Sequence, residues 1–161
     1  MRRPALSASD QRGMDAALAE AKAAVPIGEV PVGAAVVVRG RVISRAHNET
    51  VVGNDLTRHA ELLAIQWALR ALGTDRLDDA TLYVTLEPCA QCAGAIVLTR
   101  VARVVFGAYD PKAGMAGSVG DLLRHPRLNH HPEVIGGVME EECGELLKGF
   151  FEVKRGNVGR G

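Results

Sequence analysis

Two cysteines three positions apart, Cys89 and Cys92, are the residues of this sequence best suited to chemistry. They follow Pro88, and the run at residues 80–86 before it is rich in residues that favour strands. Because proline suits the first position of a helix, we predict a strand at 80–86 and a helix at 88–99. Both sulfurs then share one face of the first helical turn, where free N–H groups favour thiolate over thiol. The pair therefore predicts part of a metal site.

His59 is the best candidate for a third ligand, because the pattern predicts that it also stands at the start of a helix. One imidazole and two thiolates form a typical zinc set, and three protein ligands leave the fourth tetrahedral position for water. Glu61 is poorly placed to bind the same ion, but its carboxylate can take a proton from zinc-activated water and pass it to a substrate nitrogen. We therefore predict a catalytic zinc site with His59, Cys89 and Cys92 as ligands and Glu61 as the proton shuttle.

A structural zinc site is the alternative, and it requires a fourth protein ligand. The candidates are Cys143, His125, His130 and His131. Cys143 falls on the predicted apolar side of the last helix, which favours a small buried hydrophobe, and the histidines fall in a loop. The combination of H-x-E with P-C-x-x-C is more specific than either half alone and favours the catalytic site.

The elements that must position these residues alternate along the chain. Helices are predicted at residues 11–24, 59–72, 88–99, 121–125 and 140–154, with Ser9 or Asp10 as the cap of the first. A hairpin is predicted from strands at 34–38 and 42–46, followed by strands at 80–86, 103–108 and 133–138. This order predicts an α/β fold in which a mixed five-stranded sheet carries helices on both faces.

Composition limits the possible classes of protein. The 161 residues predict a single domain with a core at about residues 10–155 and short flexible tails at 1–9 and 156–161. A formal net charge of zero argues against a uniformly basic nucleic-acid binder, and three cysteines are too few for a disulfide framework. Neither a signal peptide nor a membrane-length apolar run is evident, so we expect a soluble cytoplasmic protein with no membrane partner.

Beyond the zinc pattern, the chain resembles the bacterial tRNA-specific adenosine deaminases of the cytidine and deoxycytidylate deaminase superfamily. The resemblance extends over about residues 13–155 and is carried by residues 29–34, 59–61, 85–95, 103–108, 110–112, 128–130 and 150–151. It implies a three-layer α/β/α cytidine-deaminase-like fold with one Zn²⁺ per subunit. It also implies hydrolytic deamination of adenosine to inosine at the wobble position of a tRNA anticodon, that of an arginine tRNA. The family is homodimeric, with residues of the partner subunit in the pocket.

The resemblance also implies roles for residues outside the zinc set. Asn48 would hydrogen-bond the purine, Val30 and Ala60 would line the base pocket, and Asp110 would contact the flipped nucleotide's sugar or its neighbour. Phe151 or its neighbour Phe150, with Lys154 and Arg155, would contact the anticodon loop.

Each of these residues also has a purely structural interpretation. Asn48 could satisfy its own loop backbone, Asp110 could form a turn, and Phe151 could pack in the core. The zinc pattern alone would equally serve a deaminase of free cytidine, cytosine or guanine, which is the alternative function.

Overall fold

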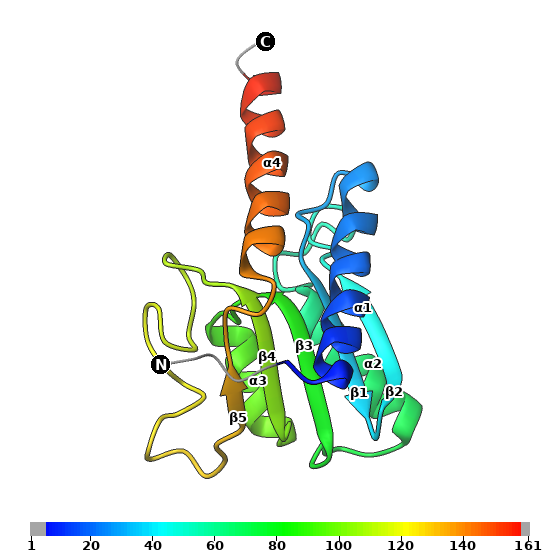
Figure 1. Cartoon of the computed structure of the whole chain (residues 1–161), viewed down its shortest axis with the longest axis vertical. Helices are drawn as coiled ribbons and strands as arrows, with labels where there is room; N and C mark the ends of the chain where they lie inside the picture. Colours follow the sequence, from blue (N-terminus) through cyan, green and yellow to red (C-terminus); the bar gives the residue numbers. More distant parts are fainter. Residues whose placement is uncertain (1–5, 159–161) are drawn as a thin grey trace.

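A five-stranded sheet forms the centre of the protein, for which the computed structural model describes residues 6–158 (Figure 1). The strand order is β2-β1-β3-β4-β5. The strands are β1 (Gly33–Val38), β2 (Arg41–His47), β3 (Ala80–Leu86), β4 (Arg103–Ala108) and β5 (Glu133–Ile135). The predicted mixed sheet is confirmed: β1 is antiparallel to β2 and β3, whereas β3, β4 and β5 run parallel.

The parallel strands β3 and β4 end at the same edge of the sheet, because Leu86 pairs with Ala108. The segments that leave these strands therefore start side by side. One leads through Pro88 to Cys89 and the other leads to Asp110. The topology thus places the cysteine pair next to a loop that the sequence assigned to substrate binding.

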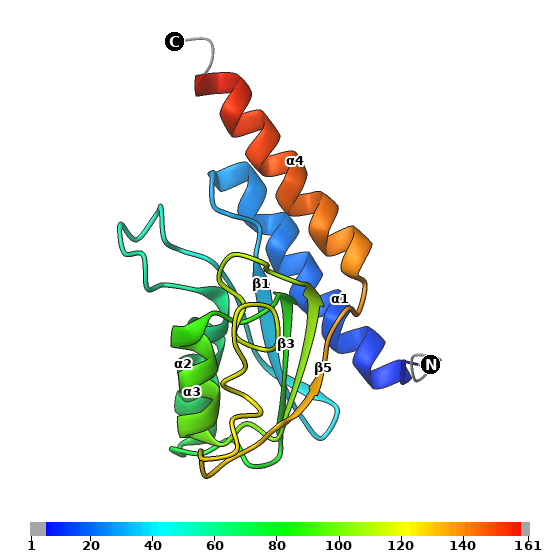
Figure 2. The ribbon, with the colours of Figure 1, turned by 90° about the vertical axis from the view of Figure 1, so that its left-hand side faces the viewer.

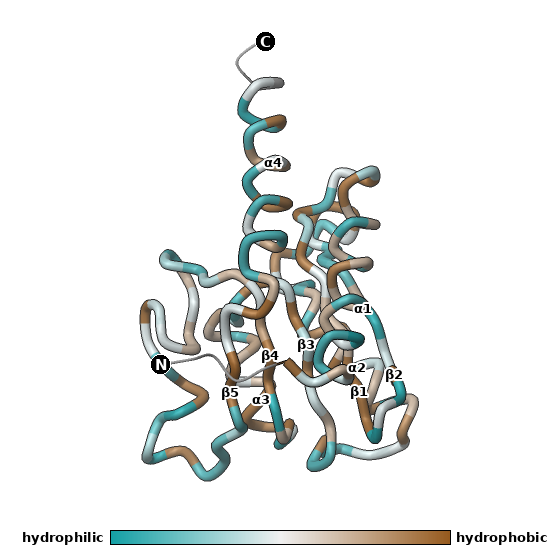
Figure 3. Tube along the Cα trace, viewed as in Figure 1, coloured by the Kyte–Doolittle hydropathy of each residue, from teal (hydrophilic) through white to brown (hydrophobic). Residues whose placement is uncertain are grey.

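Helices cover both faces of the sheet, as predicted (Figure 2). The helices α1 (Ala8–Ala24) and α4 (Glu140–Val158) lie on one face, and α2 (Ala60–Leu72) and α3 (Ala90–Thr99) lie on the other. A short 3-10 helix, η1 (Val25–Ile27), follows α1. Figure 3 shows hydrophobic residues along the strands and a mixture of hydrophobic and hydrophilic residues along α1 and α4, which face the sheet on one side only.

The first helix begins earlier than predicted, because its cap is Ser7 and neither Ser9 nor Asp10. The Ser7 hydroxyl accepts a hydrogen bond from the backbone N–H of Asp10 at 3.0 Å. Asp10 is buried, and its carboxylate receives both terminal nitrogens of Arg103 at 2.8 and 2.9 Å and the Tyr83 hydroxyl at 2.7 Å. This polar contact with β3 and β4 fixes the first helical turn on the sheet, so residues 6–9 are not the predicted tail.

Other boundaries also differ from the predictions. Residues 121–125 form turns and a bridge between Ala116 and Asp121 where a short helix was expected. β5 stops before Gly136, whereas the prediction continued through the glycines to residue 138. α4 continues to Val158, beyond the predicted end at residue 154, whereas the tail residues 1–5 and 159–161 lie outside the described part. Among the described helices, none combines the length and apolar character that crossing a membrane requires.

Candidate active site

The first part of the site is the start of α2, where His59 is the N-cap residue, as predicted. Its backbone is extended, with φ −76° and ψ 148°, and helical geometry begins at Ala60. The side chain of Asn48 takes over the capping role, because its Oδ1 accepts a hydrogen bond from the backbone N–H of Ala60 at 2.8 Å. Asn48 therefore ties the end of the hairpin to the first turn of α2 and fixes the position of His59.

The second part of the site is the start of α3. Cys89 is the N-cap residue and Cys92 lies in the first turn, so the helix begins two residues later than the predicted position 88. Pro88 consequently precedes the cap and keeps Glu87 extended. The side-chain amide of Gln91 donates to the backbone carbonyl of Thr57 at 2.9 Å, which joins this helix start to the loop before His59.

The three predicted ligands come together between these two helix starts. The His59 Nδ1 atom lies 3.4 Å from the sulfur of Cys89 and 3.6 Å from that of Cys92. One ligand atom from each residue lies within 4.8 Å of the others. Bond lengths of 2.0–2.3 Å and tetrahedral angles give about 3.6 Å between a nitrogen and a sulfur on one zinc ion. The two nitrogen–sulfur distances therefore match those of a tetrahedral zinc site.

The electrostatics of this trio favour a metal-binding thiolate. A hydrogen bond from Cys92, aided by His59, lowers the pKa of Cys89 to about 3 despite burial. The same contact with Cys89, together with burial, raises the pKa of Cys92. The hydrogen bond with Cys89 also raises the pKa of His59. The two cysteines therefore share a thiolate, which is the form that binds a metal ion.

Glu61 lies beside this cluster in the first turn of α2, with 4% of its surface exposed. Burial raises the pKa of its carboxyl to about 7, against the opposing influence of its own backbone N–H and of His59. Cys92 is a hydrogen-bond partner of the carboxyl group. A carboxyl group with a pKa near neutrality is suited to accept a proton and release it again.

No fourth ligand joins the cluster among the described residues. Cys143 is buried on the other face of the sheet, with Met14 and Val105, as the small hydrophobe that its helical position predicted. The Nε2 atom of His130 contacts the carbonyl of Val101 at 2.7 Å, and that of His131 contacts the carbonyl of His125 at 2.7 Å. These histidines stabilise loops, which leaves a three-residue set typical of a catalytic centre.

The remaining predicted site residues differ in how they relate to the cluster. The Oδ1 of Asn48 is engaged by the backbone N–H of Ala60. Its Nδ2 has no hydrogen-bond partner among the described residues and is not buried, so it is accessible to a ligand. Val30 is half-buried at the edge of the core, whereas Ala60 is completely buried. Phe151 lies on α4, on the opposite face from α2 and α3, is 41% exposed and packs edge-to-face on Phe150.

Asp110 begins the loop after β4 and forms the turn that its sequence position suggested. Its Oδ1 accepts from the backbone N–H groups of Lys112 at 3.0 Å and Ala113 at 3.2 Å. Within the described residues, its second carboxylate oxygen takes part in no hydrogen bond or ion pair. Asp110 can therefore form its turn and still offer one oxygen to a ligand.

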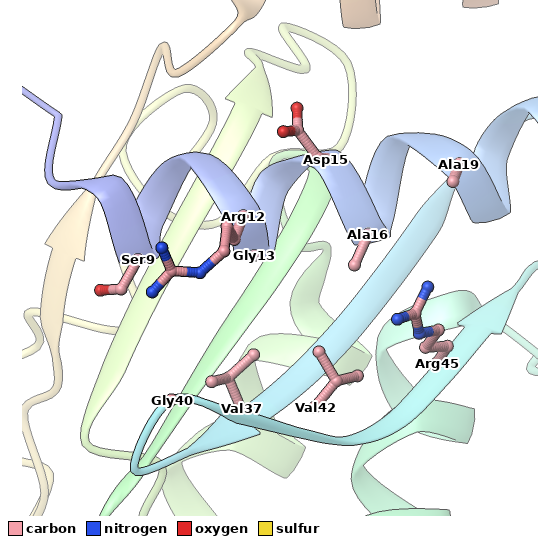
Figure 4. Close-up of a pocket in the computed structure, with 10 residues that line it drawn as sticks. All are labelled: Ser9, Arg12, Gly13, Asp15, Ala16, Ala19, Val37, Gly40, Val42 and Arg45. Atoms are coloured by element: carbon pink, nitrogen blue, oxygen red, sulfur yellow. The ribbon is translucent and has the colours of Figure 1, made fainter.

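A groove of about 370 Å³ lies between α1 and the β1–β2 hairpin (Figure 4). Figure 4 shows Arg12 projecting from α1 and Arg45 from β2 on its two sides. The groove is on the α1 face of the sheet, and neither the ligand set nor Glu61 lines it. It therefore takes no part in the candidate active site.

Comparison with known proteins agrees with this geometry. A family model for MafB19-like deaminases matches residues 8–155. The tRNA-specific adenosine deaminase of Bacillus subtilis (strain 168) is 53% identical over 146 residues, which cover 91% of each chain. That of Agrobacterium fabrum is 47% identical over 88% of this chain and 93% of its own. The chain belongs to the family of tRNA-specific adenosine deaminases.

Solved structures extend the family likeness to three dimensions. A structure from work on A-to-I editing by tRNA:A34 deaminases at the wobble position of transfer RNA matches with a TM-score of 0.82 and 46% identity. The match covers 85% of this chain and 99% of the other. A guanine deaminase from Nitrosomonas europaea has a TM-score of 0.76 and 23% identity, covering 92% and 86% of the two chains, which shows a shared fold alone. The predicted three-layer deaminase fold is confirmed.

Two further glutamates of this family member support the site, and sequence reasoning missed both. Glu29 is completely buried and accepts hydrogen bonds from the backbone of Val51 and Val52 in the loop between Asn48 and His59. Glu87 is 2% exposed and is surrounded by the loop that starts at Asp110. The only available signal was a charged residue next to a proline or within an otherwise apolar run, which does not specify a partner.

Proposed function

We propose that this protein hydrolytically deaminates adenosine to inosine at the wobble position of a tRNA anticodon. The observation that carries the proposal is the group of His59, Cys89 and Cys92 with the buried Glu61 beside it. This arrangement supports hydrolytic deamination. The substrate assignment draws on relatives that are about 50% identical in sequence over nearly the whole chain.

His59 Nδ1 and the sulfurs of Cys89 and Cys92 would hold one Zn²⁺ per subunit. The ion supplies activation of a water molecule, whose pKa it lowers from 15.7 to about 7. Glu61 would accept the proton that such a water gives up and donate it to N1 of adenine, so that C6 would receive the hydroxyl group. Its raised pKa suits this role, because the carboxyl group would pass one proton from the water to N1 and a second from the added hydroxyl to the amino group, which then leaves as ammonia.

The proposed substrate-binding residues lie outside the group of His59, Cys89, Cys92 and Glu61. The Nδ2 of Asn48 donates to the purine, since its Oδ1 is held by Ala60. Val30 lines the wall around the base, and the completely buried Ala60 supports this wall from behind. Asp110 presents its second carboxylate oxygen to the sugar or its neighbour, and Phe151 offers an exposed ring to the anticodon loop. A loop nucleotide can be splayed into such a pocket, whereas a base within a duplex cannot reach it.

We further propose that residues 1–161 form a single deaminase domain that works as a homodimer in the cytoplasm on an arginine tRNA. Exposed apolar side chains support an assembly of subunits. Leu56, in the loop before His59, is 84% exposed, and Leu98 on α3 is 82% exposed. Both lie on the side of the molecule that carries α2 and α3, where burial by a second subunit would complete the pocket walls.

The decisive experiment offers the zinc-loaded protein an anticodon stem-loop with adenosine at the wobble position, free adenosine and free cytidine. We expect inosine in the stem-loop alone. The same stem-loop with the adenosine moved by one position is the control and should stay unmodified. Deamination of free cytidine without reaction of the stem-loop would overturn the proposed substrate and favour the alternative of a deaminase of free nucleosides or nucleobases.

A further inference from the structure

Glu87 forms the centre of the loop at residues 110–118. Its Oε1 accepts from the backbone N–H of Asp110 at 3.0 Å and from the hydroxyl of Ser118. Its Oε2 accepts from the backbone N–H groups of Ala116 at 3.0 Å and Ser118 at 3.1 Å. Within the described part of the chain, no ion pair involves this carboxylate. Neutral donors of a single loop therefore stabilise its charge.

The loop is fitted closely around this carboxylate. A Cβ atom at Gly114 would overlap the carboxyl group of Glu87, so a glycine is required where the loop crosses it. The backbone N–H of Met115 also donates to the carbonyl of Pro88 at 2.8 Å. The loop is thus attached to two consecutive residues that lead directly into the metal-binding Cys89.

Asp110 is fixed twice by this arrangement. Glu87 holds its backbone N–H, and the N–H groups of Lys112 and Ala113 hold its Oδ1. Its second carboxylate oxygen then points from a rigid turn. Because the same Glu87 is joined through Pro88 to Cys89, the position of that oxygen is set relative to the metal ligands.

We propose that Glu87 is a positioning residue for the deamination: its carboxylate sets the Asp110 loop against the metal-binding turn and thereby places Asp110 for the RNA. This inference rests on the proposed function. It predicts that loss of the Glu87 carboxylate acts mainly through Asp110. The metal ligands should stay in place, because they are held by α2, α3 and the Gln91–Thr57 hydrogen bond.

The test is a double-mutant cycle on the full-length, zinc-loaded protein. Glu87→Gln keeps the volume but turns an NH₂ group toward N–H donors, so it should displace the loop. A misplacement of catalytic or binding groups by about 1 Å can lower the rate by about 10²-fold. We therefore expect kcat/KM on the wobble-adenosine stem-loop to fall by about 10- to 100-fold, mostly through KM, with one zinc still bound per subunit.

In an Asp110→Ala background, Glu87→Gln should change kcat/KM by less than about twofold, since the residue through which it acts is gone. Glu29→Gln is the matched control, because Glu29 is also a buried glutamate that holds a loop, but the loop at residues 50–52. Its effect should be equally large in the presence and absence of Asp110. Equal effects of Glu87→Gln in both backgrounds would show a merely structural role and overturn the inference.

Ser118→Ala provides a second route if Glu87→Gln does not fold, because it removes one donor and leaves the carboxylate in place. We expect a smaller rise in KM that again disappears in the Asp110→Ala background. A wild-type KM, or an effect that persists without Asp110, would overturn the inference. Failure of the wild-type protein to modify the stem-loop would instead overturn the proposed function.

Discussion

Two buried glutamates flank the proposed metal ligands and have pKa values shifted in opposite directions. Glu61 lies two residues after His59, and Glu87 lies two residues before Cys89. Burial raises the pKa of Glu61 to about 7. Burial acts in the same direction on Glu87, but hydrogen bonds from Ser118, Asp110 and Ala116 outweigh it and hold its pKa below the ordinary value. Burial without compensating donors raises the pKa of Glu61, whereas several hydrogen-bond donors lower that of Glu87.

Replacing Glu61 should have the largest effect, because it removes the proton-exchanging member of the pair. For Glu61→Gln we expect kcat on the stem-loop to fall by about 10²- to 10⁴-fold, which is the usual contribution of general acid–base catalysis. Zinc content measured by mass spectrometry should remain one per subunit. The exposed Glu141 is the control, and Glu141→Gln should leave kcat unchanged. Loss of the metal from Glu61→Gln would mean that Glu61 is a ligand and not a proton shuttle.

A substitution at Gly114 tests the other member of the pair. In Gly114→Ala the added methyl group must displace the Glu87 carboxyl group, and overpacking of this kind costs about 1–3 kcal/mol of the free energy of unfolding. Gly144, within α4, has open space around the corresponding position. Gly144→Ala should therefore stabilise the protein by up to about 1 kcal/mol through helix propensity. Urea unfolding of the two variants measures the difference, and equal stabilities would contradict the close fit around Glu87.

The contrast between the two glutamates also marks how far the sequence alone could lead. The roles of His59, Cys89 and Cys92 depend on local patterns, namely a strand end followed by a helix start, and the structure brings these residues together. Strand and helix order followed from periodicity for the same reason. Glu87 forms its contacts 23 to 31 positions away, with loop backbone that has no residue signature. No spacing rule could identify it.

The boundary errors arise from side-chain hydrogen bonds that element propensities do not describe. α1 starts at Ala8 because the Ser7 hydroxyl caps it, and Arg103, 93 positions from Asp10, then holds the first turn on the sheet. The predicted short helix at 121–125 is replaced by a turn in which the Arg124 side chain binds Asp121 and the carbonyl of Ala116. Local propensity predicted the type of most elements, whereas individual side-chain hydrogen bonds set where they begin.

Asp10 extends the comparison to a third buried carboxylate, which is held by a cation. Hydrogen bonding to Arg103 lowers its pKa to about 2 from 3.8. A carboxyl group with a lowered pKa in the folded state contributes stability above its unfolded pKa and loses it as the pH falls. We therefore expect about 2 kcal/mol of the free energy of unfolding to disappear between about pH 4 and pH 2. In Asp10→Asn this part of the pH dependence should be absent; an unchanged pH profile would show that the ion pair contributes no stability.

Cys143→Ser is expected to have the smallest effect, and it tests whether the metal site has a fourth protein ligand. Burial raises the pKa of the Cys143 thiol to about 11, so this cysteine is neutral among apolar neighbours, whereas the pKa of Cys89 is lowered to about 3. The serine hydroxyl is more costly to bury than the thiol, and we expect a loss of about 1 kcal/mol in the free energy of unfolding. Zinc content should stay at one per subunit, whereas Cys92→Ser should lose the ion. Loss of zinc from Cys143→Ser would mean that the site has a fourth protein ligand. This result would contradict the proposal of an open catalytic centre beside Glu61.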